Sequence, residues 1–169
     1  SSETYSFGRI NLVESRYRNG LGDIVSTVAS VLARDMDKPW GYIKTIIDPA
    51  SMMYKWIQGH ASPGPILPRD FINFDDHLVM ILNGREPKEI IDGKKELGRF
   101  TIGLALFNPE TGDVPWISSK PLIDDPKARA ITFASDFLRL NKREGILYAH
   151  IDDSFVKGYK INTDGLRNY

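Results

Sequence analysis

The chain has 169 residues, of which 41% are hydrophobic and 26% charged, and its 22 basic residues balance its 22 acidic ones. This size and composition suit a globular protein of one domain or two small ones. The balance of charge argues against binding to nucleic acid or to an anionic membrane. The lack of cysteine excludes disulfides, thiolate zinc sites and cysteine nucleophiles. No apolar run approaches the roughly 20 residues of a membrane span.

The first part of the chain contains one candidate strand, at 7–13. We interpret 1–23 as an N-terminal extension or a stray strand that precedes the repeating part of the sequence.

Two later segments share the same order of features. Each begins with an apolar strand that carries small residues at alternate positions, 26–33 and 101–107. A polar turn follows each strand and leads to a tryptophan directly after a proline, Trp40 in the first segment and Trp116 in the second. The recurrence of both tryptophans favours a packing role for them.

The second halves of the two segments also match. An Asp-Phe pair begins each half, at Asp70 and at Asp136, and a second apolar strand follows each pair, at 77–82 and 145–150. Four short strands with turn signals between them, repeated along the chain, are typical of β-propeller blades. The sequence therefore predicts an all-β fold of antiparallel four-stranded blades.

The repeat divides the chain into the extension 1–23, two blades at 24–154, and the first strand of a further blade at 155–169. Propellers close with about four to eight blades, and closure hides the sheet edges. Two blades and part of a third leave edges open, which invites pairing with other chains. We therefore expect self-association, a second chain that completes the propeller, or a longer protein. A compact two-sheet sandwich is the alternative fold.

Four stretches, 59–67, 79–84, 100–106 and 148–154, resemble in their order and spacing a superfamily of glycoside hydrolases. It includes the mannoside phosphorylases of glycoside hydrolase family 130 and the arabinanase-like enzymes. The resemblance implies a five-bladed β-propeller, incomplete in this chain, that acts on an oligosaccharide or glycoside. It would cleave glycosidic bonds by hydrolysis or phosphorolysis, with inorganic phosphate needed only by a phosphorylase and no other cofactor.

Two positions depart from the pattern of that superfamily. Asn83 stands where the phosphorylases place a phosphate-handling histidine. The acidic segment that supplies the family's key aspartate has only the weak counterpart 14–16, which reads Glu-Ser-Arg. The main catalytic acid is therefore expected outside this chain. The alternative is a non-catalytic module that binds carbohydrate or serves in assembly.

Asp153 is the candidate catalytic carboxylate, because it aligns with the aspartate of the family's late Asp-Thr motif. His150 and Asp152 alternate along the same predicted strand, so we expect both to face one side and to meet sugar hydroxyls. A solvated acidic turn, and a histidine satisfied in the core, are the structural alternatives.

Lys55, Trp56 and His60 lie in or beside a Gly- and Pro-rich segment. A ring beside a cation and an imidazole suits sugar recognition, although a loop packed under its own tryptophan is the alternative. Arg69 could hold an anionic group, and pairing with neighbouring acidic residues on the surface is the alternative. Asn83 completes the substrate-binding candidates. The three histidines lack metal-ligand spacing, so no metal site is predicted. The charged stretch 86–96 is expected to form an exposed hairpin.

Overall fold

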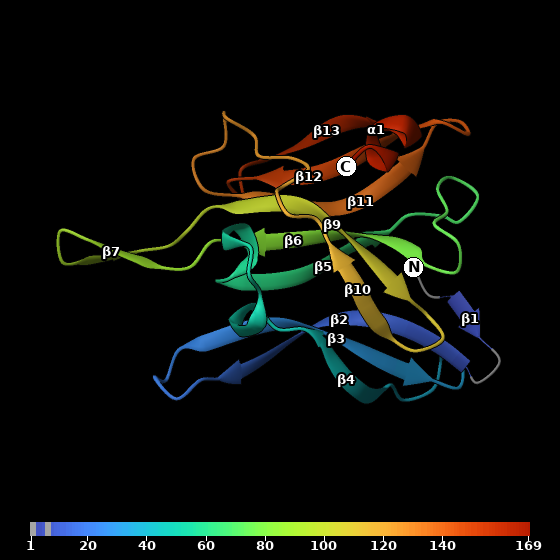
Figure 1. Cartoon of the computed structure of the whole chain (residues 1–169), viewed down its shortest axis with the longest axis horizontal. Coiled ribbons are helices and arrows are strands. Elements are labelled where there is room, and N and C mark those ends of the chain that lie inside the picture. Colours follow the sequence, from blue (N-terminus) through green and yellow to red (C-terminus); the bar gives the residue numbers. More distant parts are fainter. Residues whose placement is uncertain (1–2, 6–7) are drawn as a thin grey trace.

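The computed structural model describes residues 3–5 and 8–169 of the chain (Figure 1). This part is all-β, and its three larger antiparallel sheets lie one on another in chain order. The all-β class predicted from the sequence is thus confirmed. None of the described helices is long and apolar enough to cross a membrane.

The first sheet is a meander in which every strand pairs with the next. Its strands, in sheet order, are β1 (Glu3–Tyr5), β2 (Gly8–Arg18), β3 (Ile24–Ala33) and β4 (Gly41–Ile47). β3 is rich in the β-branched residues that suit a pleated sheet, and it lies between β2 and β4. Two short 3-10 helices, η1 (Pro49–Ser51) and η2 (Lys55–Ile57), then lead to the next sheet.

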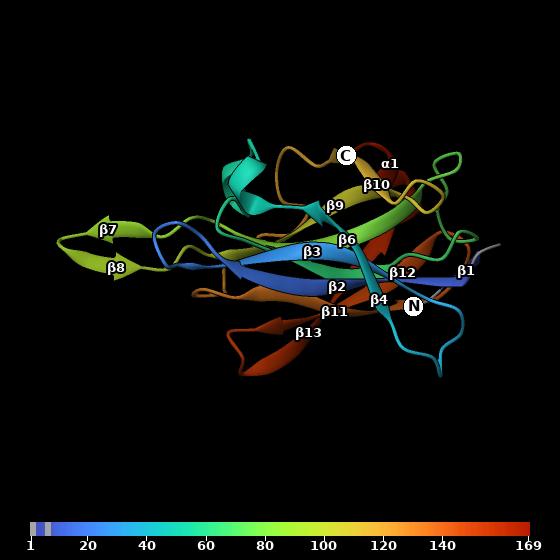
Figure 2. The ribbon, with the colours of Figure 1, turned by 90° about the horizontal axis from the view of Figure 1, so that it is seen from below.

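The second sheet repeats this meander with an insertion. Its strands, in sheet order, are β5 (His60–Ile66), β6 (Leu78–Arg85), β9 (Phe100–Asn108) and β10 (Asp113–Ile117). Between β6 and β9 the chain leaves the sheet as a separate hairpin, β7 (Glu89–Ile91) and β8 (Lys94–Glu96). Figure 1 and Figure 2 show this hairpin projecting beyond the stacked sheets. The exposed hairpin predicted at 86–96 is confirmed.

The third sheet consists of β11 (Thr132–Arg139), β12 (Glu144–Ile151) and β13 (Phe155–Asn162). The short helix α1 (Thr163–Arg167) follows it, and the Asn162 side chain caps this helix by accepting a hydrogen bond from the Gly165 amide.

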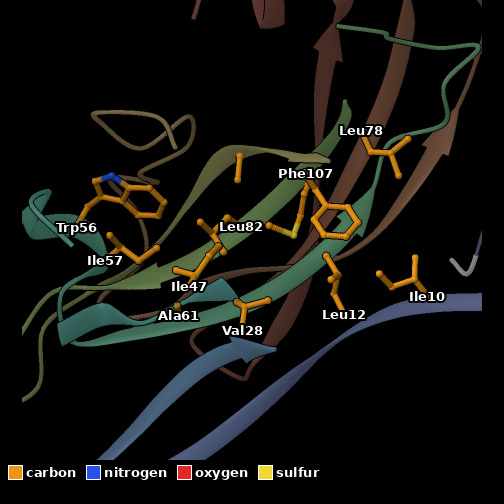
Figure 3. Packing of buried hydrophobic residues seen from close by; sticks show 12 residues of the cluster. Ile10, Leu12, Val28, Ile47, Trp56, Ile57, Ala61, Leu78, Leu82 and Phe107 are labelled. Atoms are coloured by element: carbon orange, nitrogen blue, oxygen red, sulfur yellow. The ribbon is translucent and has the colours of Figure 1, made fainter. Parts of the chain in front are cut away.

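Two apolar cores hold the stack together, one on each face of the second sheet. The first core joins the first and second sheets, and Figure 3 shows residues from both, among them Leu12, Val28, Leu82 and Phe107. The second core joins the second and third sheets through residues such as Ile81 and Leu147. β6 has a continuous apolar run because alternate residues enter opposite cores.

The sheets divide the chain at different places from the predicted units. β3 and β9 are both third strands, so the detected similarity between 26–33 and 101–107 joins equivalent positions. The sheet to which β3 belongs starts two strands earlier, because β2 pairs with β3 over Arg9 to Arg18. β13 likewise pairs with β12 along its whole length and completes the third sheet. Similarity between strands reveals the length of a repeat, but long-range strand pairing decides at which strand each unit begins and ends.

The matched Asp-Phe pairs do not occupy equivalent places. Asp70 lies in the turn that follows β5, whereas Asp136 lies within β11 beside a register irregularity. The two pairs instead meet in space, because the rings of Phe71 and Phe137 pack with centroids 4.9 Å apart.

Candidate functional site

The edge strand β5 lies where the three sheets approach one another. It contacts β2 and β3 of the first sheet and β11 of the third. At its beginning, His60 pairs with Arg85 of β6, which in turn pairs with Phe100 of β9. Glu14 of β2 reaches this row from the first sheet. We call these four residues, Glu14, His60, Arg85 and Phe100, the Glu14 cluster.

Glu14 is held as a carboxylate within the cluster. Arg16 donates to its Oε1 from Nε at 2.8 Å, and the Arg16 Nη2 lies 2.7 Å from the same oxygen. Burial raises the pKa of Glu14, but hydrogen bonds from Arg16, Ser62 and Ser26 and the nearby His60 outweigh it. The pKa of Glu14 therefore lies below its ordinary value, and the group is ionised at neutral pH.

His60 is held as a neutral imidazole beside that carboxylate. Burial lowers its pKa, while Glu14 works in the opposite direction and Arg85 adds to the lowering. Its Nε2 lies 3.5 Å from Glu14 Oε2, and its ring meets Phe100 edge-on with centroids 4.9 Å apart. The Nε2 atom is buried, and its 3.5 Å contact with the Glu14 carboxylate is long for a hydrogen bond.

Arg85 brings a second unsatisfied nitrogen to the same place. Its guanidinium lies 5.3 Å from the centroid of the Phe100 ring, and its Nη2 donates to the Gly59 carbonyl at 3.2 Å. Its Nε is buried and has no hydrogen-bond partner among the described residues. Buried polar atoms are nearly always paired, so an unpaired guanidinium nitrogen beside a long imidazole–carboxylate contact is unusual and makes the cluster a candidate site.

Lys55 and Trp56 line a cleft of about 350 Å³ near this end of the second sheet. Trp56 is only 5% exposed, and its Nε1 donates to the Ser118 carbonyl at 3.0 Å. Its ring packs so closely on Gly84 and Gly103 that neither glycine has room for a Cβ atom. Trp56 therefore anchors the segment between the first two sheets, and most of its ring is unavailable for stacking on a sugar.

Lys55 itself is largely exposed, and its Nζ forms an ion pair of 2.9 Å with Glu89 of the projecting hairpin.

Asn83 links two sheets rather than facing a ligand. Its side chain is fully buried, and its amide accepts from the Ala134 N–H at 2.7 Å and donates to the Ala134 carbonyl at 3.0 Å. The Asn83 side chain thus hydrogen-bonds to the backbone of β11 as a neighbouring strand would. A phosphate that bound to Asn83 would have to replace both hydrogen bonds.

Asp152 and Asp153 form the turn between β12 and β13, and both have positive φ. Asp152 accepts hydrogen bonds from the N–H groups of residues 129 to 131, which lower its pKa to about 2. Strand alternation ends at Ile151, so Asp152 does not share a strand face with His150 as predicted. Asp153 is exposed in the turn.

His150 is exposed on β12, where it pairs with Phe133 and Val156, and the Phe133 ring packs on Phe100 of the Glu14 cluster with centroids 5.8 Å apart.

Arg69 lies apart from the Glu14 cluster. It follows the far end of β5 and lines a separate cleft together with Asp136 and Phe137. A strand as long as β5 separates the two places by roughly 20 Å.

The structure thus brings together only some of the site residues that were predicted from the sequence. His60 lies in the Glu14 cluster, and Lys55, Trp56 and Asp152 lie at the same end of the sheets. The link to Asp152 runs through the 129–131 segment, because the Phe100 amide donates to the Ala130 carbonyl at 2.7 Å. Arg85 and Phe100 were missed, although a charged residue that ends the buried strand β6 is a usable signal.

Neither a protein-family model nor a curated protein matches this chain. Fold and site therefore define only a class, an all-β protein of successive antiparallel sheets with a half-buried carboxylate–imidazole–guanidinium cluster. Among the described residues, no group of three or more histidine, aspartate or glutamate side chains could hold a metal ion.

Proposed function

We propose that the chain is part of a carbohydrate-active β-propeller enzyme, and that the Glu14 cluster belongs to its sugar site. The enzyme would cleave glycosidic bonds by hydrolysis or phosphorolysis. The observation that carries the proposal is the ionised Glu14 carboxylate beside a neutral His60 at the edge strand β5.

The arrangement of the sheets supports the propeller. Each of the first two sheets is a four-strand meander, and the first strand of each later sheet lies against the sheet before it. Successive meanders stacked through apolar faces are how propeller blades are built. In a closed ring, β5 would face the central channel, where propeller enzymes hold their substrates.

The chemistry of the cluster supports a role in glycoside cleavage. The transition state carries oxocarbenium charge, which a carboxylate stabilises, and a second group must protonate the leaving oxygen. Glu14 suits the first role because Arg16 and two serines hold it ionised. The buried nitrogens of His60 and Arg85 would gain partners if a sugar hydroxyl or a bridging water entered.

A non-catalytic carbohydrate-binding module is the second candidate. The described groups around the Glu14 carboxylate are Arg16, Ser26, Ser62 and His60, and none of them is a second carboxyl group. Asp153 remains the sequence-based candidate for that role, on an exposed turn. Because fold alone does not define function, turnover has to be measured.

The test is a panel of p-nitrophenyl glycosides, including mannoside and arabinofuranoside, assayed with and without inorganic phosphate. We expect release of p-nitrophenol, because this leaving group departs readily without the proton donor that is expected outside the chain. We also expect at least roughly a hundredfold loss in Glu14→Gln, as for removal of an electrostatic group in a transition state. Glu110→Gln is the matched control, since Glu110 is exposed in a turn of the second sheet.

Titration with mannobiose and arabinobiose, followed by the NMR shifts of the His60 ring, separates the two candidates. Shifts without turnover would favour the binding module. If the panel gives no turnover and no shifts of the His60 ring, the carbohydrate assignment is overturned.

A further inference from the structure

A second site lies away from the Glu14 cluster, in an apolar cleft of about 290 Å³. The second sheet contributes Val79, Leu104, Leu106 and Trp116 to its lining. The C-terminal segment contributes Leu166, Arg167 and Tyr169. Ligand sites are commonly apolar hollows with few polar groups, and this volume is near the lower end of their range.

The aromatic rings of this cleft are only partly covered by the protein. Trp116 is 38% exposed, although its proline-tryptophan turn suggested a packing residue. Tyr169 is fixed in place, because its hydroxyl donates to the carbonyls of Lys120, at 3.1 Å, and of Pro121. Tyr169 is therefore held in place, so a ligand would not have to order this side chain.

Positive charge lies in the lining of the cleft, on Arg167, and beside its Tyr169, on Lys120. The Arg167 guanidinium lies 5.3 Å from the centroid of the Phe74 ring, and the Lys120 ammonium lies 5.4 Å from that of Tyr169. Neither cation forms an ion pair within the part of the chain that the structure describes. In contrast, Lys157 and Arg99 on the neighbouring elements are paired with Asp125 and Asp124.

We propose that this cleft binds a small amphipathic anion, an aliphatic or aromatic carboxylate. Its apolar part would lie on Leu104, Leu106 and Trp116, and its carboxylate would meet the guanidinium of Arg167. Arginine presents two parallel donors that match the geometry of a carboxylate. This proposal does not rest on the carbohydrate assignment.

The test compares three probes with the same chain of eight carbons: octanoate, 1-octanol and octylamine. Saturable changes in Trp116 fluorescence report binding, and Trp116→Phe shows which part of the signal comes from the cleft. We expect octanoate to bind most tightly and octylamine most weakly. Because Arg167 is exposed, the advantage of octanoate over octanol should be modest, roughly threefold.

Arg167→Gln should remove the preference for octanoate and leave the affinity for octanol unchanged. Lys142→Gln is the control, since Lys142 is another exposed cation, in the turn between β11 and β12. Far-UV circular dichroism checks that both variants remain folded. The proposal is overturned if none of the probes binds saturably, if octanol binds as tightly as octanoate, or if the two variants behave alike.

Discussion

At the scale of single residues, the two members of the Glu14–His60 pair influence each other's protonation. Burial holds the pKa of His60 below its ordinary value, and the Glu14 carboxylate partly offsets this lowering. We expect Glu14→Gln to lower the pKa of His60 further, because the charge that favours imidazolium is lost while burial remains. The measurement is an NMR pH titration of the His60 ring protons.

Glu110→Gln should leave that titration unchanged. A rise in the pKa of His60 in Glu14→Gln would show that Glu14 does not act on the imidazole as a charge.

Asp152 gives a prediction about stability and pH. Its pKa in the folded chain is about 2, below the ordinary 3.8, because three backbone N–H groups donate to its carboxylate. Its contribution to stability is therefore present above about pH 4 and is lost as the pH falls towards 2. We expect Asp152→Asn to be less stable than the unsubstituted chain at pH 7, with the difference shrinking over that acid range. Urea unfolding at a series of pH values measures it.

The neighbouring Asp153→Asn is the matched control, since Asp153 has the same positive φ and is exposed. A difference in the Asp152→Asn free energy of unfolding that stays constant from pH 7 to pH 2 would contradict the assigned cause.

At the scale of elements, the side chain of Trp56 packs η2 against the second sheet. A Cβ atom at Gly103 would collide with the Trp56 ring and with Ser118 Oγ. We expect Gly103→Ala to lower the free energy of unfolding by about 1–3 kcal/mol, the usual cost of overpacking. Chemical denaturation followed by tryptophan fluorescence provides the measurement.

Gly20→Ala is the control, because a Cβ atom at Gly20 meets nothing within 4 Å. Equal stabilities of the two variants would mean that the ring of Trp56 moves aside at little cost.

The sequence predicted strands and the inserted hairpin better than it predicted the grouping of strands. The strands at 26–33 and 101–107 were recognisable because small and large residues alternate in them, and 86–96 because its charges leave no apolar face. The strand at which each unit begins was not recognisable from the sequence, since the pairing of β2 with β3 is one of many pairings that similar strands allow.

For the candidate site, the limit was distance along the chain. His60 stood out because of its residue type, whereas its partners Glu14 and Phe100 are 46 positions before it and 40 positions after it (60 − 14 and 100 − 60). Only the packing of three sheets brings them together. Asn83 and Trp56 were predicted to bind ligand because their buried partners, Ala134 and Ser118, are 51 and 62 positions away, so the sequence contained no sign of these contacts.

At the scale of the whole molecule, the two outer sheets each present an open face. The third sheet packs on the second through one face, and its other face carries Leu138 and Val156, which are 49% and 58% exposed. The first sheet carries Tyr42, 61% exposed, on its outer face. Exposed apolar faces of this kind favour association. We expect the isolated chain to form a dimer or larger assembly, measured by light scattering.

The double variant Leu138→Lys and Val156→Lys should shift that assembly towards single chains, because it charges the open face. Met53→Lys, at an exposed loop position, should not. A single-chain mass for the unsubstituted chain at all concentrations would remove the support for a propeller completed in trans.

The meander topology also bears on the order in which the chain acquires structure during synthesis. Every strand of the first sheet finds its partners within residues 3–47, and the second sheet finds its own within 60–117. Contacts that are local in sequence form early, and ribosomes deliver roughly 5–20 residues per second. The first sheet can therefore pair its strands before β11 is translated, and each later sheet emerges onto an apolar surface that is already in place.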